Sequence, residues 1–184
     1  MDDNRILFVD LDGTLIKEDL SNLAFIYYLK KNPVKLFCHL IIFLFKGKSF
    51  LKEKISTDFI VPIEKLNFNE ACIEYVRKVK NHHRVVYLIA GSHEVLVDQI
   101  NQHVKIFFDV NKTKKNFNMV GINKVKFINE KLKIFSFDYL GNSKKDLPIW
   151  YHTKRIIYTN ISNDLKRIID ISDLDKVEVK EKFN

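Results

Sequence analysis

The feature that most constrains this chain is an apolar run at residues 5–10 that ends in two aspartates, one residue apart. The run predicts a strand, and Asp10, Asp12 and Gly13 stand at its end. Two carboxylates at one strand tip repel each other, so a cation or a shared proton must offset the cost. Gly13 lets the backbone turn sharply and lets a ligand approach closely. The pattern predicts a Mg²⁺-assisted phosphoryl-transfer site. The alternative is an Asp-Gly hairpin turn, but the residues after Leu15 do not resemble a returning strand.

The chain has 184 residues, of which 46% are hydrophobic and 29% charged. These values are typical of one folded domain that has room for an insertion. The formal net charge of +8 raises the question of a nucleic-acid partner. The lysines are spread along the whole chain, however, and no aromatic-rich basic motif accompanies them, so we expect no nucleic acid. Anionic substrates, an anionic membrane surface or a lysine-rich solvated surface explain the excess equally well.

Two observations favour a cytoplasmic location. Cys38 and Cys72 have apolar neighbours in the sequence and no metal-ligand spacing, which predicts small buried side chains in a reducing compartment. The acidic residues at the N-terminus run straight into the first strand, and no secretory signal is visible there. Peripheral association with a membrane is left open.

Strands and helices are expected to alternate along the chain. Predicted strands cover residues 5–10, 84–89, 106–110, 134–140 and 155–159, and the last ten residues are expected to fray. Predicted helices cover residues 21–31, 34–45, 50–59, 69–80, 94–103, 124–133 and 164–170, with a helical turn at 146–152 and Asn163 as a cap. This alternation predicts an α/β fold with a doubly wound parallel sheet. Asp10, Ser92 and Gly141 fall at the carboxyl ends of strands, where ligands bind in such sheets.

The motif Asp10-Leu-Asp12-Gly13-Thr14 resembles the leading motif of the haloacid dehalogenase (HAD) superfamily of phosphohydrolases. The resemblance implies a HAD-like Rossmannoid core in which Asp10 attacks phosphorus and Asp12 acts as general acid and base. It also implies that Gly13 and Thr14 lie against the phosphate. Mg²⁺ would be held by the Asp10 carboxylate, the Asp12 carbonyl and a side chain of the fourth motif.

The second motif departs from the family pattern. Ala90 occupies the position where the family has a hydroxyl, and Ser92 follows two residues later. Ser92, with the backbone N–H groups of Gly91 and Ser92, is expected to bind the phosphoryl oxygens. The alternative is that Ser92 caps a helix that begins at His93, and both roles are compatible.

The third and fourth motifs complete the expected site. Lys124 is the lysine chosen to neutralise Asp10 and the phosphate. Its competitors are Lys112, Lys114, Lys115 and Lys126. The fourth motif follows the strand that ends at Gly141 and has Asn142 in place of the family's first aspartate. An amide ligates Mg²⁺ without contributing charge, so metal affinity should fall. Asp146 is expected to bind the metal, directly or through water, or to orient Lys124.

Residues 17–66 are too long for a plain loop and are predicted to form a helical cap, with residues 1–16 and 67–184 as the catalytic core. Together with Asn32-Pro33, residues 47–52 and residues 139–143, the run from Asp10 to Asp19 resembles the phosphatase-like domains fused ahead of a polyprenyl-transferring membrane domain. The cap contains the lysine-flanked apolar run Leu36–Phe45, which is too short to span a bilayer. It is either buried between cap and core or laid on a membrane surface.

These features predict a Mg²⁺-dependent phosphomonoester hydrolase that forms an aspartyl-phosphate. The expected substrate is a small organic or lipid-linked phosphate. The alternative is a catalytically weak or inactive HAD-like binding or regulatory module, because Ala90 and Asn142 depart from the family pattern. The retained pair Asp10 and Asp12 argues against this alternative.

Overall fold

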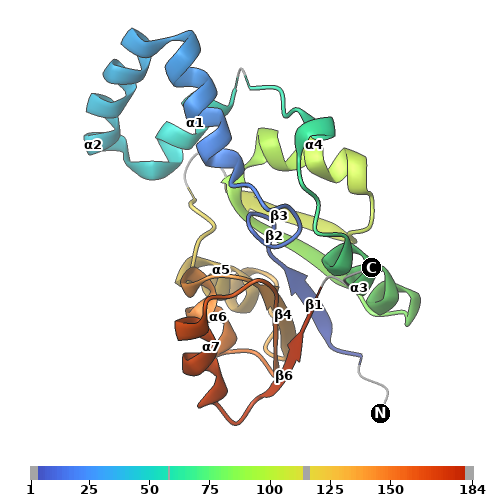
Figure 1. Cartoon of the computed structure of the whole chain (residues 1–184). Coiled ribbons are helices and arrows are strands. Elements are labelled where there is room, and N and C mark those ends of the chain that lie inside the picture. The colour runs from blue at the N-terminus through green and yellow to red at the C-terminus, as the bar shows by residue number, and fades with distance from the viewer. Residues whose placement is uncertain (1–3, 58, 114–116, 181–184) are drawn as a thin grey trace.

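The computed structural model of the protein describes residues 4–57, 59–113 and 117–180. Its centre is a sheet of six parallel strands in the order β3-β2-β1-β4-β5-β6 (Figure 1). The strands are β1 Ile6–Val9, β2 Val86–His93, β3 Asp109–Thr113, β4 Phe137–Gly141, β5 Arg155–Tyr158 and β6 Asp175–Glu178. The predicted doubly wound α/β fold is therefore confirmed.

Helices cover both faces of the sheet because the strands are apolar on both faces. On β1, Leu7 and Val9 pack into a core that they share with α3 and α4, whereas Phe8 packs into a second core with α5, α6 and α7. The bounds of these helices are α3 Glu70–Asn81, α4 Glu94–Val104, α5 Ile122–Lys126, α6 Leu147–Trp150 and α7 Asn163–Asp170. A π-helical turn at Phe127–Lys131 and 3₁₀ turns at Ile63–Lys65 (η1) and Lys144–Asp146 (η3) complete the elements.

The strand order reverses at β1. The chain adds β2 and β3 on one side of β1, then returns to the other side as β4. At such a switch point the loops diverge beyond the carboxyl ends of the strands and leave a crevice. The backbone N–H of Asp10 donates to the carbonyl of Leu140 at 2.9 Å, so the loop after β1 starts beside the end of β4.

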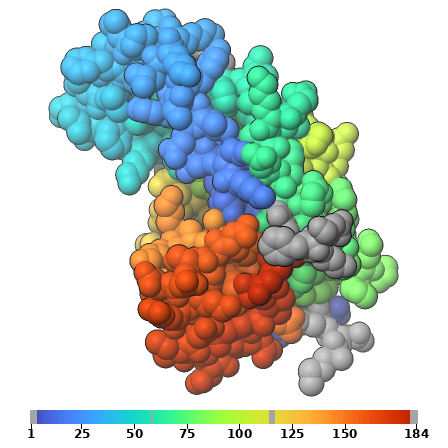
Figure 2. Space-filling view, viewed as in Figure 1, coloured from blue at the N-terminus to red at the C-terminus, as the bar shows by residue number. Residues whose placement is uncertain are grey.

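Two long helices follow β1. Helix α1 covers Leu20–Lys31 and α2 covers Pro33–Ser56, both within the range predicted as the cap. Helix α2 bends at Gly47, where φ is +77° and ψ is 179°, a conformation open essentially to glycine alone. The bend divides α2 into two segments, close to the two helices predicted here. The pair projects from one end of the molecule, away from α7 and β6 (Figures 1 and 2). Within the described residues, every helix is too short or too polar to cross a bilayer.

Two predictions near the end of the chain are wrong. Residues expected to fray form the edge strand β6, because it pairs with β5 and Val179 is buried beyond it. The last helix is capped by Ser162, not by Asn163, since the Ser162 hydroxyl accepts a hydrogen bond from the N–H of Leu165 at 3.3 Å. Residues 181–184 lie outside the described part of the chain.

Other corrections concern boundaries and burial. Strand β3 starts three residues later than predicted, and β2 continues to His93 through an irregular pairing with β3. The predicted helix at 124–133 is α5 followed by the π-helical turn. Cys72 is buried as expected, but Cys38 is exposed on α2.

Candidate active site

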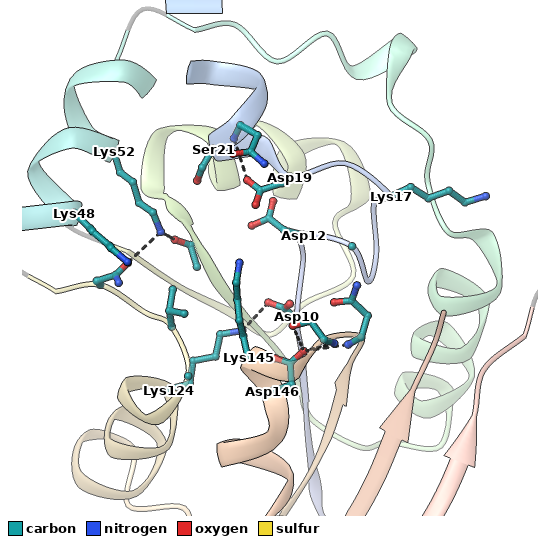
Figure 3. Close-up of a pocket in the computed structure, with 18 residues that line it drawn as sticks. Asp10, Asp12, Lys17, Asp19, Ser21, Lys48, Lys52, Lys124, Lys145 and Asp146 are labelled. Carbon is teal, nitrogen blue, oxygen red and sulfur yellow. Dashed lines mark hydrogen bonds and ion pairs between the residues drawn. The ribbon is translucent and has the colours of Figure 1, made fainter. Parts of the chain in front are cut away.

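A cavity of about 460 Å³ lies at the carboxyl ends of β1, β2 and β4, below α1 and α2 (Figure 3). Its lining includes seven of the residues that the sequence singled out: Asp10, Asp12, Gly13, Gly91, Lys124, Asn142 and Asp146. These residues come from four separate stretches of the chain, which the strand order brings to one edge of the sheet.

Asp10 and Lys124 form a buried ion pair, with 2.6 Å between the ammonium nitrogen and a carboxylate oxygen. Burial, the largest effect, raises the pKa of Asp10 to about 7. Lys124 opposes the rise, and the charges of Asp146 and Asp12 add to it. One ammonium group therefore does not compensate the negative charge at the end of β1.

The competing lysines occupy other positions. Lys112 pairs with Asp98, and Lys126 is exposed on α5. Lys114 and Lys115 lie outside the described residues.

Tyr139 connects Lys124 to Asp146, a link that sequence analysis missed. The Lys124 ammonium donates to the Tyr139 hydroxyl at 2.8 Å, and the hydroxyl donates to Asp146 at 2.7 Å. Burial, followed by the charges of Asp146 and Asp10, raises the pKa of Tyr139 well above its ordinary value, so the hydroxyl keeps its proton. The available signal was a tyrosine inside a buried strand, since a buried hydroxyl needs a partner.

Asp146 holds the loop after β4 in place through hydrogen bonds. One of its oxygens accepts from the N–H groups of Asn142 and Ser143 and from the Ser143 hydroxyl, at 3.0–3.1 Å. The other accepts from Tyr139. Both oxygens of Asp146 are therefore engaged with protein donors.

Asn142 lies against the turn after β1. Its amide oxygen accepts a hydrogen bond from the Thr14 hydroxyl at 3.3 Å. A Cβ on Gly13 would come within 2.2 Å of the Asn142 amide nitrogen, so this approach requires glycine. The loops after β1 and β4 are thus packed directly against each other.

Asp12 is held by two donors. The N–H of Leu20 donates to one carboxylate oxygen at 2.9 Å, and the Ser92 hydroxyl donates to the other at 2.7 Å. Burial is the largest effect on Asp12 and raises its pKa, although both hydrogen bonds act in the opposite direction. The Ser21 hydroxyl lies 3.1 Å from that of Ser92, so this network joins α1 to the core.

Ser92 and Thr14 were both expected to contact phosphate, and neither lines the cavity. Both are fully buried and bind residues of the site instead. The alternative that Ser92 caps a helix is wrong, because the cap of α4 is His93, whose ring nitrogen accepts from the N–H of Val95. The proposed phosphate contact of Ser92 stays a prediction.

The donor set of the site suits a hard divalent cation. Asp10, Asp12, Asn142 and Asp146 offer only oxygen ligands from their side chains, as Mg²⁺ requires. Among the described residues, no three His, Cys, Asp or Glu side chains converge as a metal cluster. Mg²⁺ is commonly held by one or two carboxylates, with water and substrate phosphate completing its shell, so the residues present fit it.

No protein-family model matches this sequence. The uncharacterized protein y4nM of Sinorhizobium fredii (strain NBRC 101917 / NGR234) is 29% identical over 144 residues, which are 78% of this chain and 28% of that protein. The present chain therefore spans little more than a quarter of the length of this relative.

Solved structures of HAD-superfamily hydrolases share the fold. A substrate-bound phosphoserine phosphatase aligns with a TM-score of 0.60 at 14% identity, over 95% of this chain and 92% of that chain. A phospho-aspartyl intermediate analogue of phosphoserine phosphatase gives 0.57 at 14%, over 97% and 94%. The haloacid dehalogenase-like hydrolase SP0104 from Streptococcus pneumoniae gives 0.62 at 13%, over 98% and 96%. The chain thus has the fold of HAD-type hydrolases.

Proposed function

We propose that this protein hydrolyses phosphomonoesters through a phosphorylated aspartate, Asp10. The observation that carries the proposal is the ion pair of Asp10 with buried Lys124, beside Asp12, in the cavity at the carboxyl ends of the strands. The likeness in fold to phosphoserine phosphatase, and to the phospho-aspartyl analogue of that enzyme, supports the same chemistry.

The residues divide the reaction between them. A carboxylate oxygen of Asp10 forms a bond to phosphorus while the bond to the leaving oxygen breaks, and Asp12 gives its proton to that oxygen. The raised pKa of Asp12 favours the protonated form that this step needs. Asp12 then takes a proton from a water molecule that attacks the phosphorus, which releases phosphate and restores the Asp10 carboxylate. Lys124 holds positive charge beside Asp10 throughout.

Mg²⁺ would be held by Asp10, by the main-chain carbonyl of Asp12 and by the loop that carries Asn142 and Asp146. When bound, it would offset the repulsion between the Asp10 carboxylate and the phosphate dianion. Because both oxygens of Asp146 already accept hydrogen bonds, we assign Asp146 to positioning Tyr139 and the loop, with any metal contact through water. Asn142 brings no charge, so we expect Mg²⁺ to bind weakly.

The substrate class is a small organic or lipid-linked phosphomonoester. The first part of this statement rests on the size of the cavity, which lies within the range of pockets that hold whole small molecules. The second part rests on the resemblance of the sequence to domains fused with polyprenyl-transferring membrane domains.

Hydrolysis of a chromogenic aryl phosphate, with and without Mg²⁺, tests the proposal. We expect turnover by the native chain with Mg²⁺ and none by Asp10→Asn. Equal rates for the native chain and Asp10→Asn would rule out the proposal that this protein is an enzyme acting through Asp10. The competing function is a silent binding module, which the substitutions at Ala90 and Asn142 favour. If the protein is such a module, we expect phosphate to bind and raise the melting temperature, with no hydrolysis of the aryl phosphate.

A further inference from the structure

Four lysines line the cavity in addition to Lys124. The side chain of one of them, Lys17, points away from the centre of the site in Figure 3, and the other three are Lys48, Lys52 and Lys145. Lys48 and Lys52 come from the part of α2 that follows the bend at Gly47, and Lys145 comes from η3 after β4 (Figure 3). Lys48 and Lys52 are four residues apart, so they share one face of the helix. The bend turns this face toward the core, and α2 packs against β2.

The charges of Lys48, Lys52 and Lys145 are not neutralised by ion pairs among the described residues. Lys52 donates to two neutral acceptors, the carbonyl of Gly91 at 2.6 Å and the side-chain oxygen of Asn118 at 3.1 Å. Among the described residues, no carboxylate forms a salt bridge with Lys48, Lys52 or Lys145. Burial lowers the pKa of Lys52, Asp12 and Asp19 oppose this effect, and Lys145 and Lys48 add to it. Three lysines therefore share one wall of the cavity without a direct ion pair, although the carboxylates of Asp12 and Asp19 act on Lys52 from a distance.

Such an arrangement becomes favourable when an anion enters it. The phosphate to be cleaved is already served by Lys124 and the proposed metal, at the end of β1. Lys48 and Lys52 reach the cavity from α2, on the side opposite the end of β1, and Lys145 reaches it from the loop after β4. The cavity has room for more than one phosphate group.

We infer that the substrate carries a second anionic group, a carboxylate or another phosphate, which Lys48, Lys52 and Lys145 bind. This inference rests on the proposed phosphatase function and narrows its substrate class. The lysines touch the part of the substrate that does not react, so they set specificity rather than perform the chemistry.

Matched pairs of substrates test this inference. Glycerol 3-phosphate is compared with 3-phosphoglycerate, and fructose 6-phosphate with fructose 1,6-bisphosphate. We expect the second member of at least one pair to show the higher kcat/KM; which pair does so distinguishes a carboxylate from a phosphate. Lys145→Gln should raise KM for the preferred substrate roughly tenfold, the worth of one charge-assisted hydrogen bond, with little change for its partner. Lys144→Gln, the exposed neighbour outside the cavity, is the control.

A binding measurement separates the two proposals. In the Asp10→Asn background, 3-phosphoglycerate or fructose 1,6-bisphosphate should raise the melting temperature more than its partner with a single anionic group, and Lys145→Gln should remove the difference. If the two members of each pair give equal kcat/KM and equal rises in melting temperature, the inference of a second anionic group on the substrate is wrong, even if the enzyme is active. If the doubly anionic ligand raises the melting temperature more than its partner but the native chain shows no turnover, the proposed phosphatase function is wrong and the anion-binding site is retained.

A second inference rests on a different surface, the first segment of α2. Its apolar side chains are exposed: Val34 by 77%, Phe37 by 66%, Leu44 by 75% and Phe45 by 85%. The sequence left open whether the apolar run Leu36–Phe45 is buried or lies on a membrane. The prediction that the run is buried is wrong for most of its side chains. Leu36 is the side chain of the run that is nearly covered, at 2%.

The charge of this region has one sign. Residues 20–52 contain six lysines and no aspartate or glutamate. Four of these lysines are exposed around the apolar run, namely Lys30, Lys31, Lys35 and Lys46, whereas Lys48 and Lys52 follow the bend and line the cavity. The helix pair also forms a projecting end of the molecule, where a flat partner can reach it (Figures 1 and 2).

We propose that the first segment of α2 docks on an anionic lipid bilayer. Exposed aromatic and aliphatic side chains would enter the boundary between headgroups and acyl chains, and the lysines would meet the anionic headgroups. A bilayer fits better than a protein surface because residues 20–52 offer large apolar side chains with positive charges alone, and no acidic side chain to pair with a protein partner's bases.

Flotation with vesicles tests the docking. We expect the full chain to float with vesicles containing phosphatidylserine and to remain unbound with pure phosphatidylcholine, and binding should fall as salt rises. The double variant Phe37→Ser and Phe45→Ser should lose at least tenfold in binding. The control is Phe108→Ser with Phe135→Ser, which removes two phenylalanines of similar exposure, 73% and 69%, elsewhere.

Two outcomes would overturn the docking. One is equal flotation of the two double variants. The other is a concentration-dependent dimer, seen by light scattering without vesicles and lost in the Phe37 and Phe45 variant, with no vesicle binding. This second result would show that the first segment of α2 contacts another copy of the chain instead of a bilayer.

Discussion

The ammonium nitrogen of Lys124 lies 2.6 Å from a carboxylate oxygen of Asp10, although 114 residues separate the two along the chain. Both side chains are almost completely enclosed, with exposed fractions of 4% and 11%. The pair therefore couples the stability of the fold to the charge that the proposed reaction needs.

Replacing Lys124 should damage both stability and activity. Lys124→Met leaves the Asp10 carboxylate buried without its partner, which should cost about 3 kcal/mol in the free energy of unfolding. Urea unfolding measures this loss, and the loss should shrink below pH 7 because Asp10 then takes up a proton. Lys126→Met, on the exposed side of α5, should change the free energy by less than about 0.5 kcal/mol. Similar losses in both variants would contradict the pairing.

Asp12→Asn should stabilise the metal-free protein while it abolishes turnover. The pKa of Asp12 is raised in the folded state, so folding favours the protonated form and stability falls as pH rises past the ordinary pKa of 3.8. Asparagine removes this cost and still accepts from the N–H of Leu20, while its amide can donate to the Ser92 hydroxyl.

We expect Asp12→Asn to raise the melting temperature at pH 7.5 by about 3 °C, the effect of about 1 kcal/mol in a chain of this size. The gain over the native chain should diminish toward pH 4, where the Asp12 carboxyl becomes increasingly protonated in both the folded and the unfolded chain. Differential scanning fluorimetry across this range, in a chelator, gives the measurement. A gain that is independent of pH would point to packing instead of charge.

The sequence was sufficient for the fold and for placing Asp10, Asp12 and Gly13 at the end of β1, because these depend on local patterns. Apolar runs followed by turns specify strands, and the carboxyl ends of parallel strands meet at one edge. Lys124 was chosen by its place after Gly121, and the structure brings this lysine to Asp10. The edge strand β6 was missed, since its pairing with β5 outweighs its charged sequence.

The connections inside the site could not be predicted because they depend on directions of side chains. Tyr139 has an ordinary place in an apolar strand, and only the packing of α5 and η3 against β4 turns it into a bridge. Ser92 was matched to phosphate by its position near a strand end. The irregular pairing between Ala90 and His93 directs its hydroxyl to Asp12.

Tyr139→Phe tests the bridge between Lys124 and Asp146. Loss of the hydroxyl removes one partner from each, which should cost about 1–2 kcal/mol in stability. We expect kcat to fall roughly tenfold, less than for Lys124→Met, since the contact between Lys124 and Asp10 remains. Tyr151→Phe, whose side chain is 63% exposed at the end of α6, should leave the unfolding curve and the rate unchanged.

Asn142→Asp should strengthen Mg²⁺ binding at the expense of the metal-free protein. The change adds a carboxylate beside Asp10, Asp12 and Asp146, so repulsion should lower the melting temperature in a chelator. The Thr14 hydroxyl still has an oxygen to donate to, and the loop therefore keeps its place. An added anionic ligand should tighten Mg²⁺ binding by on the order of tenfold, about 1.4 kcal/mol.

The dependence of the melting temperature on Mg²⁺ concentration measures this gain without requiring turnover. Asn22→Asp, which adds the same charge to the cavity from α1, is the matched control. A larger Mg²⁺ response in Asn142→Asp alone would identify position 142 as a metal ligand, because general attraction between the cavity and a cation would act in both variants. An equal response in the two would remove Asn142 from the metal site and leave the Asp10 carboxylate as the principal candidate.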